Sequence, residues 1–172
     1  NGRIDEDSYL EKMENDNNGI EVSNYKIANK TTLGKPVIES FDFLFENQAD
    51  VIGDKIYLSP LLFHANVENP FKLEKRDYPI DFVFPWHERN IVNIEMPKGY
   101  KVISIPEPAA FAMPNGRGNY SYRILQKDNV LQVMVDLKMN NAIIPVDEYQ
   151  GMKELFKKVV EKETEKVVLS KI

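Results

Sequence analysis

The chain has 172 residues, of which 42% are apolar and 28% are charged, a balance typical of a globular domain. Lys and Arg number 22 against 27 Asp and Glu, and the resulting net charge of −5 argues against a nucleic-acid or anionic-membrane partner. The absence of cysteine excludes disulfides, cysteine–metal sites and a thiol nucleophile, and no apolar run reaches the ~18 residues of a membrane span.

Residues 1–19 are predicted to be a linker or the tail of an upstream domain. The acidic stretch Asp5-Glu6-Asp7 suits the positive end of a helix dipole, so we expect a short helix here that ends before Gly19. The chain begins at Asn1 without an initiator methionine, which predicts a mature product or a piece of a longer polypeptide.

Residues 20–172 are predicted to form one mainly β domain, because short stretches alternate apolar and polar residues as strands with one buried face do. The expected strands cover residues 20–28, 36–45, 55–59, 78–84, 91–96, 100–105, 120–125 and 130–139. A bulge at Asn24-Tyr25 accounts for the broken alternation in the first strand. The clearest alternating face consists of Leu131, Val133, Val135, Leu137 and Met139.

Turn residues predict how the strands connect. The tripeptide 97–99 predicts a hairpin between the strands on either side of it, and Asp128-Asn129 predicts a second hairpin. Asn115-Gly116 is a further tight-turn signal. The apolar stretch 60–64 is expected to enter the core.

The hydrophobic period changes after Pro145. Apolar residues then recur at spacings of three and four, which predicts an amphipathic helix over residues 147–164, with Asp147 and Gln150 arranged like a capping box. Residues 167–169 are expected to form a last strand. The predicted fold is an antiparallel β-sandwich, immunoglobulin-like or distorted, with this C-terminal helix packed on it and a short N-terminal helix.

Candidate chemistry is sparse. A Ser–His–Asp arrangement would need His64 or His87 beside a serine such as Ser59 or Ser104, but no Gly-x-Ser-x-Gly nucleophile elbow is present. The histidines also lack metal-ligand spacing. We therefore predict no catalytic residue, no metal and no cofactor, and we rank a serine hydrolase last among the possible functions.

Aromatic residues offer a binding surface instead. Trp86, expected in a loop with His87, and the loop carrying Phe111 and Met113 are the candidates for contact with another domain or a ligand. Tyr120 and Tyr122 fit either a sugar-binding platform or, more commonly, the core.

A series of short motifs in a fixed order resembles a known family. The motifs are Asp54-Lys55-Ile56-Tyr57-Leu58-Ser59-Pro60, Asn69-Pro70-Phe71, Arg76-Asp77-Tyr78-Pro79-Ile80-Asp81-Phe82, Met96-Pro97-Lys98-Gly99-Tyr100, Ile105-Pro106, Tyr149 and Val168-Leu169. Together they resemble the C-terminal β domain of unknown function that follows the transglutaminase-like core in exported bacterial proteins.

The resemblance implies a non-catalytic accessory domain. The family's catalytic Cys, His and Asp belong to the preceding papain-like core, and no position of this chain matches them. The implied partner is that upstream core in the same polypeptide, and the implied location is periplasmic or extracellular. The alternative is a free-standing surface module that binds a glycan or a protein.

The family motifs are interpreted as structural. Their residues are Arg76, Tyr78, Pro79, Asp81, Pro97, Gly99 and Tyr100. We expect Arg76 and Asp81 to fix the direction of the strand at Tyr78 through polar contacts. Their alanine substitutions are then predicted to be non-additive in thermal unfolding.

Overall fold

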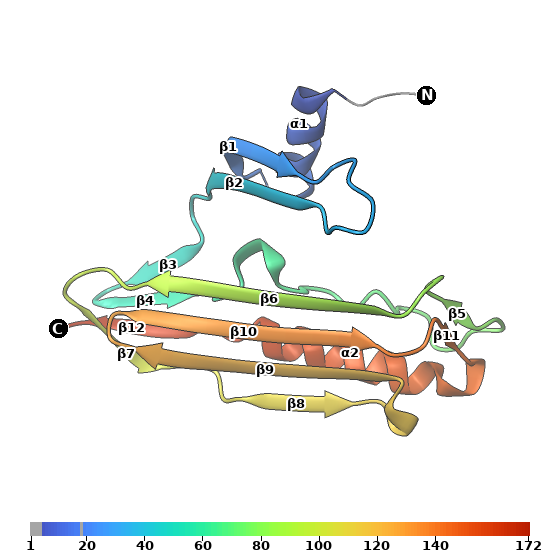
Figure 1. Ribbon diagram of the computed structural model, residues 1–172. Coiled ribbons are helices and arrows are strands. Elements are labelled where there is room, and N and C mark those ends of the chain that lie inside the picture. The colour runs from blue at the N-terminus through green and yellow to red at the C-terminus, as the bar shows by residue number, and fades with distance from the viewer. Residues whose placement is uncertain (1–4, 18) are drawn as a thin grey trace. The chain divides into compact units, whose positions relative to one another are not determined.

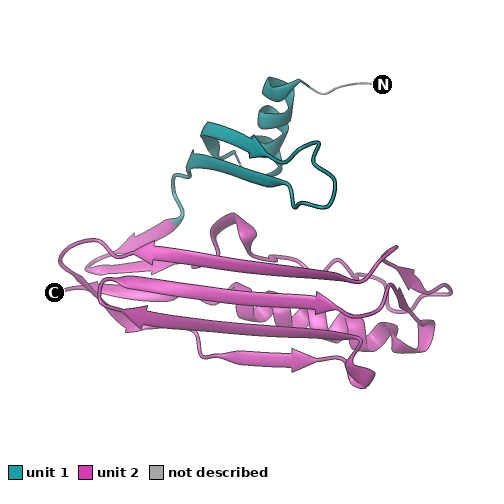
Figure 2. Ribbon diagram, in the orientation of Figure 1, with its two compact units in different colours: residues 1–48 teal, residues 49–172 magenta. Residues whose placement is uncertain are grey.

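The computed structural model describes residues 5–17 and 19–172. The chain divides into two compact units, residues 1–48 and 49–172 (Figure 2). The first two strands of the β domain predicted over residues 20–172, those at residues 20–28 and 36–45, lie in the N-terminal unit. Residues 1–4 and 18 of the predicted linker lie outside the described residues.

The N-terminal unit combines one helix with a two-stranded antiparallel sheet (Figure 1). Its elements are α1 (Glu6–Asp16), β1 (Glu21–Ala28) and β2 (Ile38–Leu44). The Asp5 carboxylate accepts a hydrogen bond from the Ser8 amide at 2.8 Å and caps α1, so the predicted short helix is confirmed. The predicted bulge in β1 is also confirmed, because its register shifts between Ser23 and Lys26.

A four-stranded antiparallel sheet forms one layer of the C-terminal unit (Figure 1). In spatial order its strands are β6 (Trp86–Glu95), β10 (Val130–Met139), β9 (Gly118–Lys127) and β8 (Ala109–Ala112). The predicted hairpin at Asp128-Asn129 joins β9 to β10 and is confirmed. Trp86 and His87, expected in a loop, begin β6.

A second antiparallel sheet uses strands from distant parts of the chain. In spatial order these are β3 (Ala49–Ile52), β4 (Lys55–Leu58), β12 (Val167–Lys171) and β7 (Tyr100–Ser104). The hairpin predicted around residues 97–99 is wrong, because β6 pairs with β10 and β7 pairs with β12. The residues 97–99 turn the chain from one sheet to the other, with Gly99 at φ 82°.

The strand predicted over residues 78–84 is largely wrong. Only β5 (Ile80–Asp81) forms, paired with β11 (Ile143–Ile144). Val83 has φ 70°, which breaks the extended backbone, and the Asp81 side chain accepts a hydrogen bond from the Val83 amide at 2.7 Å. Alternation alone could not reveal this local turn.

Helix α2 (Tyr149–Glu163) confirms the predicted amphipathic helix and lies behind the four-stranded sheet in Figure 1. The predicted capping box is wrong, because the cap position is Glu148, which makes no side-chain capping bond. A 3-10 turn, η3 (Val146–Glu148), moves the helix start past Asp147. Two further 3-10 turns are η1 (Leu62–His64) and η2 (Pro114–Gly116).

One hydrophobic core joins both sheets and α2. The predicted face of β10 is buried throughout, and the inward residues of α2 and β12 pack against the same cluster. Leu61 is fully buried, as expected for residues 60–64. The mainly β fold with antiparallel sheets, one C-terminal helix and a short N-terminal helix is thus confirmed. Among the described residues, neither helix has the length and apolarity to cross a membrane.

Candidate functional site

The three predicted surface residues occupy different environments. Trp86 is partly buried, with its ring centre 6.0 Å from that of Phe82. Met113 is only 3% exposed and belongs to the core, so its side chain is not part of an accessible surface. Phe111 is half-buried on β8 and lines a hollow of the surface.

Phe111 contacts both the sheet and the helix. Its ring stacks on the Tyr120 ring at 5.7 Å between centres and 8° between planes. On the helix side, the Lys158 ammonium lies 5.7 Å from the centre of the Phe111 ring, a cation–π arrangement. This aromatic side chain therefore links β8, β9 and α2.

A groove of about 440 Å³ runs between β8 and α2. Its walls consist of Ala110, Phe111, Ala112 and Pro114 from the strand side, and Gly151, Glu154, Leu155 and Lys158 from the helix. The helix residues share one face because they recur at spacings of three and four. We refer to these eight residues as the β8–α2 groove.

The backbone of β8 forms hydrogen bonds to β9 along one edge only. The Met113 amide donates to the Gly118 carbonyl at 2.8 Å, and Phe111 pairs with Tyr120 in the same register. Since bonding residues alternate along an antiparallel strand, the N–H and C=O groups of Ala110 and Ala112 point away from β9. Among the described residues no strand pairs with this outer edge of β8, which lies at the margin of the sheet in Figure 1.

The sequence signals for this groove were present but separate. Phe111 was predicted as a contact residue, whereas Glu154 and Lys158 have no sequence signal beyond lying within the helix predicted over residues 147–164. Predicting the groove requires knowing that β8 is the edge strand of its sheet and that it packs beside α2. No local sequence pattern encodes this contact.

Two of the family-motif residues, Arg76 and Asp81, make structural contacts. The Arg76 guanidinium lies 5.9 Å from the centre of the Tyr149 ring, and Asp81 accepts a hydrogen bond from the Val83 amide. These two contacts share no residue. Tyr78 is 78% exposed and makes no contact that would make it part of the core.

The two histidines have different surroundings. The His64 ring lies 4.3 Å from the Phe63 ring between centres, with the two planes tilted by 41°, and burial lowers the pKa of His64. His87 lies on the exposed face of the four-stranded sheet, where its Nε2 is 2.7 Å from Asp136 Oδ1 and Arg89 shares the same carboxylate. No group of three or more His, Asp or Glu side chains is placed to hold a metal ion in residues 5–17 and 19–172.

The tyrosines considered as a sugar platform are buried. Tyr120 and Tyr122 are 1% and 2% exposed. Burial is the main cause of the raised pKa of both hydroxyls, and nearby acidic side chains raise it further. The core interpretation is the one that the structure supports for this pair.

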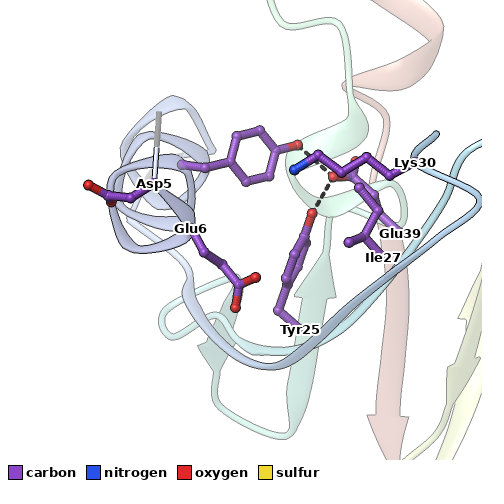
Figure 3. Close-up of a pocket in the computed structure, with 7 residues that line it drawn as sticks. Asp5, Glu6, Tyr25, Ile27, Lys30 and Glu39 are labelled. Carbon is purple, nitrogen blue, oxygen red and sulfur yellow. Dashed lines mark hydrogen bonds between the residues drawn. The ribbon is translucent and has the colours of Figure 1, made fainter. Parts of the chain in front are cut away.

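The N-terminal unit contains a separate hollow of about 270 Å³ (Figure 3). Glu39 Oε1 accepts hydrogen bonds from the Tyr9 hydroxyl at 2.8 Å and the Tyr25 hydroxyl at 2.5 Å. The bond to Glu39 is the main cause of the raised pKa of Tyr25. Because the three side chains come from α1, β1 and β2, this network ties the elements of the unit together rather than leaving polar groups free.

Comparison with known proteins identifies one family. Residues 54–169 match the family described as "Domain of Unknown Function with solved-structure structure (DUF3858)". A search of the curated proteins gave no match. Among solved structures, the chain is similar to the crystal structure of a "putative protease" from Parabacteroides distasonis ATCC 8503, with 15% identity and a TM-score of 0.49. The similarity covers 57% of this chain and 19% of that one.

Proposed function

The chain belongs to the DUF3858 family, and from this premise we propose that it is a non-catalytic accessory domain that binds a transglutaminase-like core in the same polypeptide. The observation that carries the proposal is the β8–α2 groove beside the unpaired edge of β8. Such an edge is a ready template for a partner chain, and the half-buried Phe111 supplies an aromatic contact there.

Two further features support this proposal. The chain has no cysteine, so it cannot itself supply the thiol nucleophile of a papain-like mechanism. The order of its motifs resembles domains that follow such a core in exported proteins, which also supports a periplasmic or extracellular location.

The test is to isolate the polypeptide encoded upstream of Asn1 and mix it with this chain. We expect a Cys, His and Asp set in that polypeptide, co-elution of the two in gel filtration, and a change in the activity of the core. Lys158→Glu alters the groove without touching the core of the domain and is expected to weaken the complex. The proposal fails if the upstream polypeptide lacks the catalytic set or elutes separately.

A further inference from the structure

Only a short part of the outer edge of β8 can form backbone hydrogen bonds with another strand. Ala110 and Ala112 direct their backbone groups outward, and both have small, exposed side chains that let another strand approach closely. Pro108 and Pro114 lie two residues before Ala110 and two residues after Ala112, so they are the next positions on this edge. Since proline has no N–H, they limit pairing to Ala110 and Ala112.

The groove beneath this edge carries a negative side chain, Glu154, and a positive one, Lys158, at different points along its length. Pro114 lies next to Gly151, and α2 then runs back along β8, so Glu154 and Lys158 follow each other toward the start of the strand. Lys158 is exposed and makes no ion pair with any described residue, although its ammonium is held over Phe111. A cation without an ion-pair partner among the described residues, placed beside an apolar ring, favours a ligand with a carboxylate at this end.

We infer that the β8–α2 groove binds an extended peptide strand that pairs antiparallel with β8 and places a carboxylate against Lys158. The strand adds to the sheet edge, where backbone groups give affinity and alternate side chains give specificity. The ligand residue opposite Phe111 points into the groove and is apolar. The residue two positions further along carries the carboxylate, and the residue two positions before it is cationic and faces Glu154.

This arrangement argues for a peptide rather than a second copy of the chain. Two copies joined edge to edge around Phe111 would bring the Lys158 ammonium groups of both copies toward the same axis, and like charges repel. An acidic strand removes that repulsion. The inference rests on the proposed function, because it names how that function's partner is held.

The probe is the peptide Thr-Lys-Thr-Val-Thr-Glu-Thr with blocked ends, labelled for fluorescence anisotropy. We expect saturable, sub-millimolar binding. Lys158→Glu should weaken it about fivefold through loss of the ion pair. The matched variant Lys157→Glu changes an exposed neighbour outside the groove and should leave the affinity unchanged. A peptide with Lys and Glu exchanged should bind more weakly.

Backbone pairing is tested without altering the fold. N-methylation of the two threonines next to valine, which face Ala110 and Ala112, should weaken binding about fivefold for each lost hydrogen bond, whereas N-methylation of valine should not. In amide NMR spectra the signals of Ala110 and Ala112 should move on titration. Failure of the probe to bind, or shifts confined to another surface, would overturn the inference.

The two proposals fail separately. If the upstream core binds while the Ala110 and Ala112 amides stay unchanged, the accessory role stands and the strand-addition inference is wrong. If the peptide binds at β8 but the core does not co-elute, the groove is a peptide site and the transglutaminase-like partner is wrong.

Discussion

The buried carboxylate of Glu163 accepts two hydrogen bonds from Asn66, at 2.6 Å from the backbone N and 2.9 Å from the side-chain Nδ2. Glu163 is 2% exposed, and it is the one buried charged side chain among the described residues. The pair attaches the end of α2 to the loop that precedes residue 69. Burial raises the pKa of Glu163 above its ordinary value of 4.5, against the opposing effect of the Asn66 donors.

The raised pKa of Glu163 gives a pH dependence of definite sign. Because the folded state holds this proton more tightly, the contribution of Glu163 to stability is complete below pH 4.5 and is lost as pH rises through the folded-state pKa. Glu163→Gln keeps an acceptor for Asn66 but does not ionise. Urea unfolding between pH 4 and neutrality, roughly the range where carboxylates titrate, should show wild type losing stability relative to Glu163→Gln. A difference independent of pH would contradict this reading.

Two glycines should respond oppositely to alanine substitution. A Cβ at Gly118 would lie 2.6 Å from Met139 Cε and 2.9 Å from Met139 Sδ, within the core. A Cβ at Gly151 in α2 would make ordinary contacts, at 3.5 Å to Pro114 Cδ and 3.7 Å to Met113 Cε. Because Met139 is fully buried, the end of its side chain can shift only by disturbing the core, so Gly118→Ala should cost about 1–3 kcal/mol. Gly151→Ala should instead stabilise by about 0.4–1 kcal/mol, mainly by reducing the conformational entropy of the unfolded chain.

Thermal unfolding of both glycine variants provides the measurement. Equal and small effects would show that the contact between β9 and β10 at Met139 is looser than described.

Arg76 and Asp81 should act independently. Their positions on either side of Tyr78 predicted non-additive effects, but Arg76 lies over the Tyr149 ring and Asp81 accepts a hydrogen bond from the Val83 amide. Because these contacts share no residue, the double alanine variant should equal the sum of the single variants within about 0.5 kcal/mol. A larger coupling energy in a double-mutant cycle would restore the earlier interpretation.

The ion pair on the exposed face of the four-stranded sheet should contribute little. Burial favours a higher pKa for Asp136, but the hydrogen bonds from His87 and Arg89 outweigh it and hold the pKa below 3.8. The contribution is complete above pH 3.8 and is lost as pH falls through the folded-state pKa. Asp136→Asn should cost about 0.5–1 kcal/mol at neutral pH in urea unfolding, with the difference shrinking in acid.

Local patterns predicted the elements whose burial repeats along the sequence. The alternation from Leu131 to Met139 identified a buried strand face, and the change of period after Pro145 identified α2. Both elements satisfy their pattern within a single contiguous segment, so no knowledge of distant partners was needed.

Features that depend on distant pairing were missed. Residues 97–99 have the composition of a hairpin turn, yet the strands on either side pair with other strands. β6 pairs with β10, and β7 pairs with β12. The positive φ of Val83 could not be predicted from the sequence, because β-branched residues rarely adopt this backbone conformation. The groove arises only when β8 and α2 meet, and Glu163 becomes buried only when the end of α2 meets the loop at Asn66.

The most direct test of the accessory role is gel filtration of this chain with the upstream transglutaminase-like core, comparing wild type, Lys158→Glu and Lys157→Glu. The account predicts that wild type and Lys157→Glu co-elute with the core, and that Lys158→Glu shifts toward the free protein. Separate elution of all three, or equal complexes with both lysine variants, would contradict the claim that the edge of β8 and its groove form the binding surface.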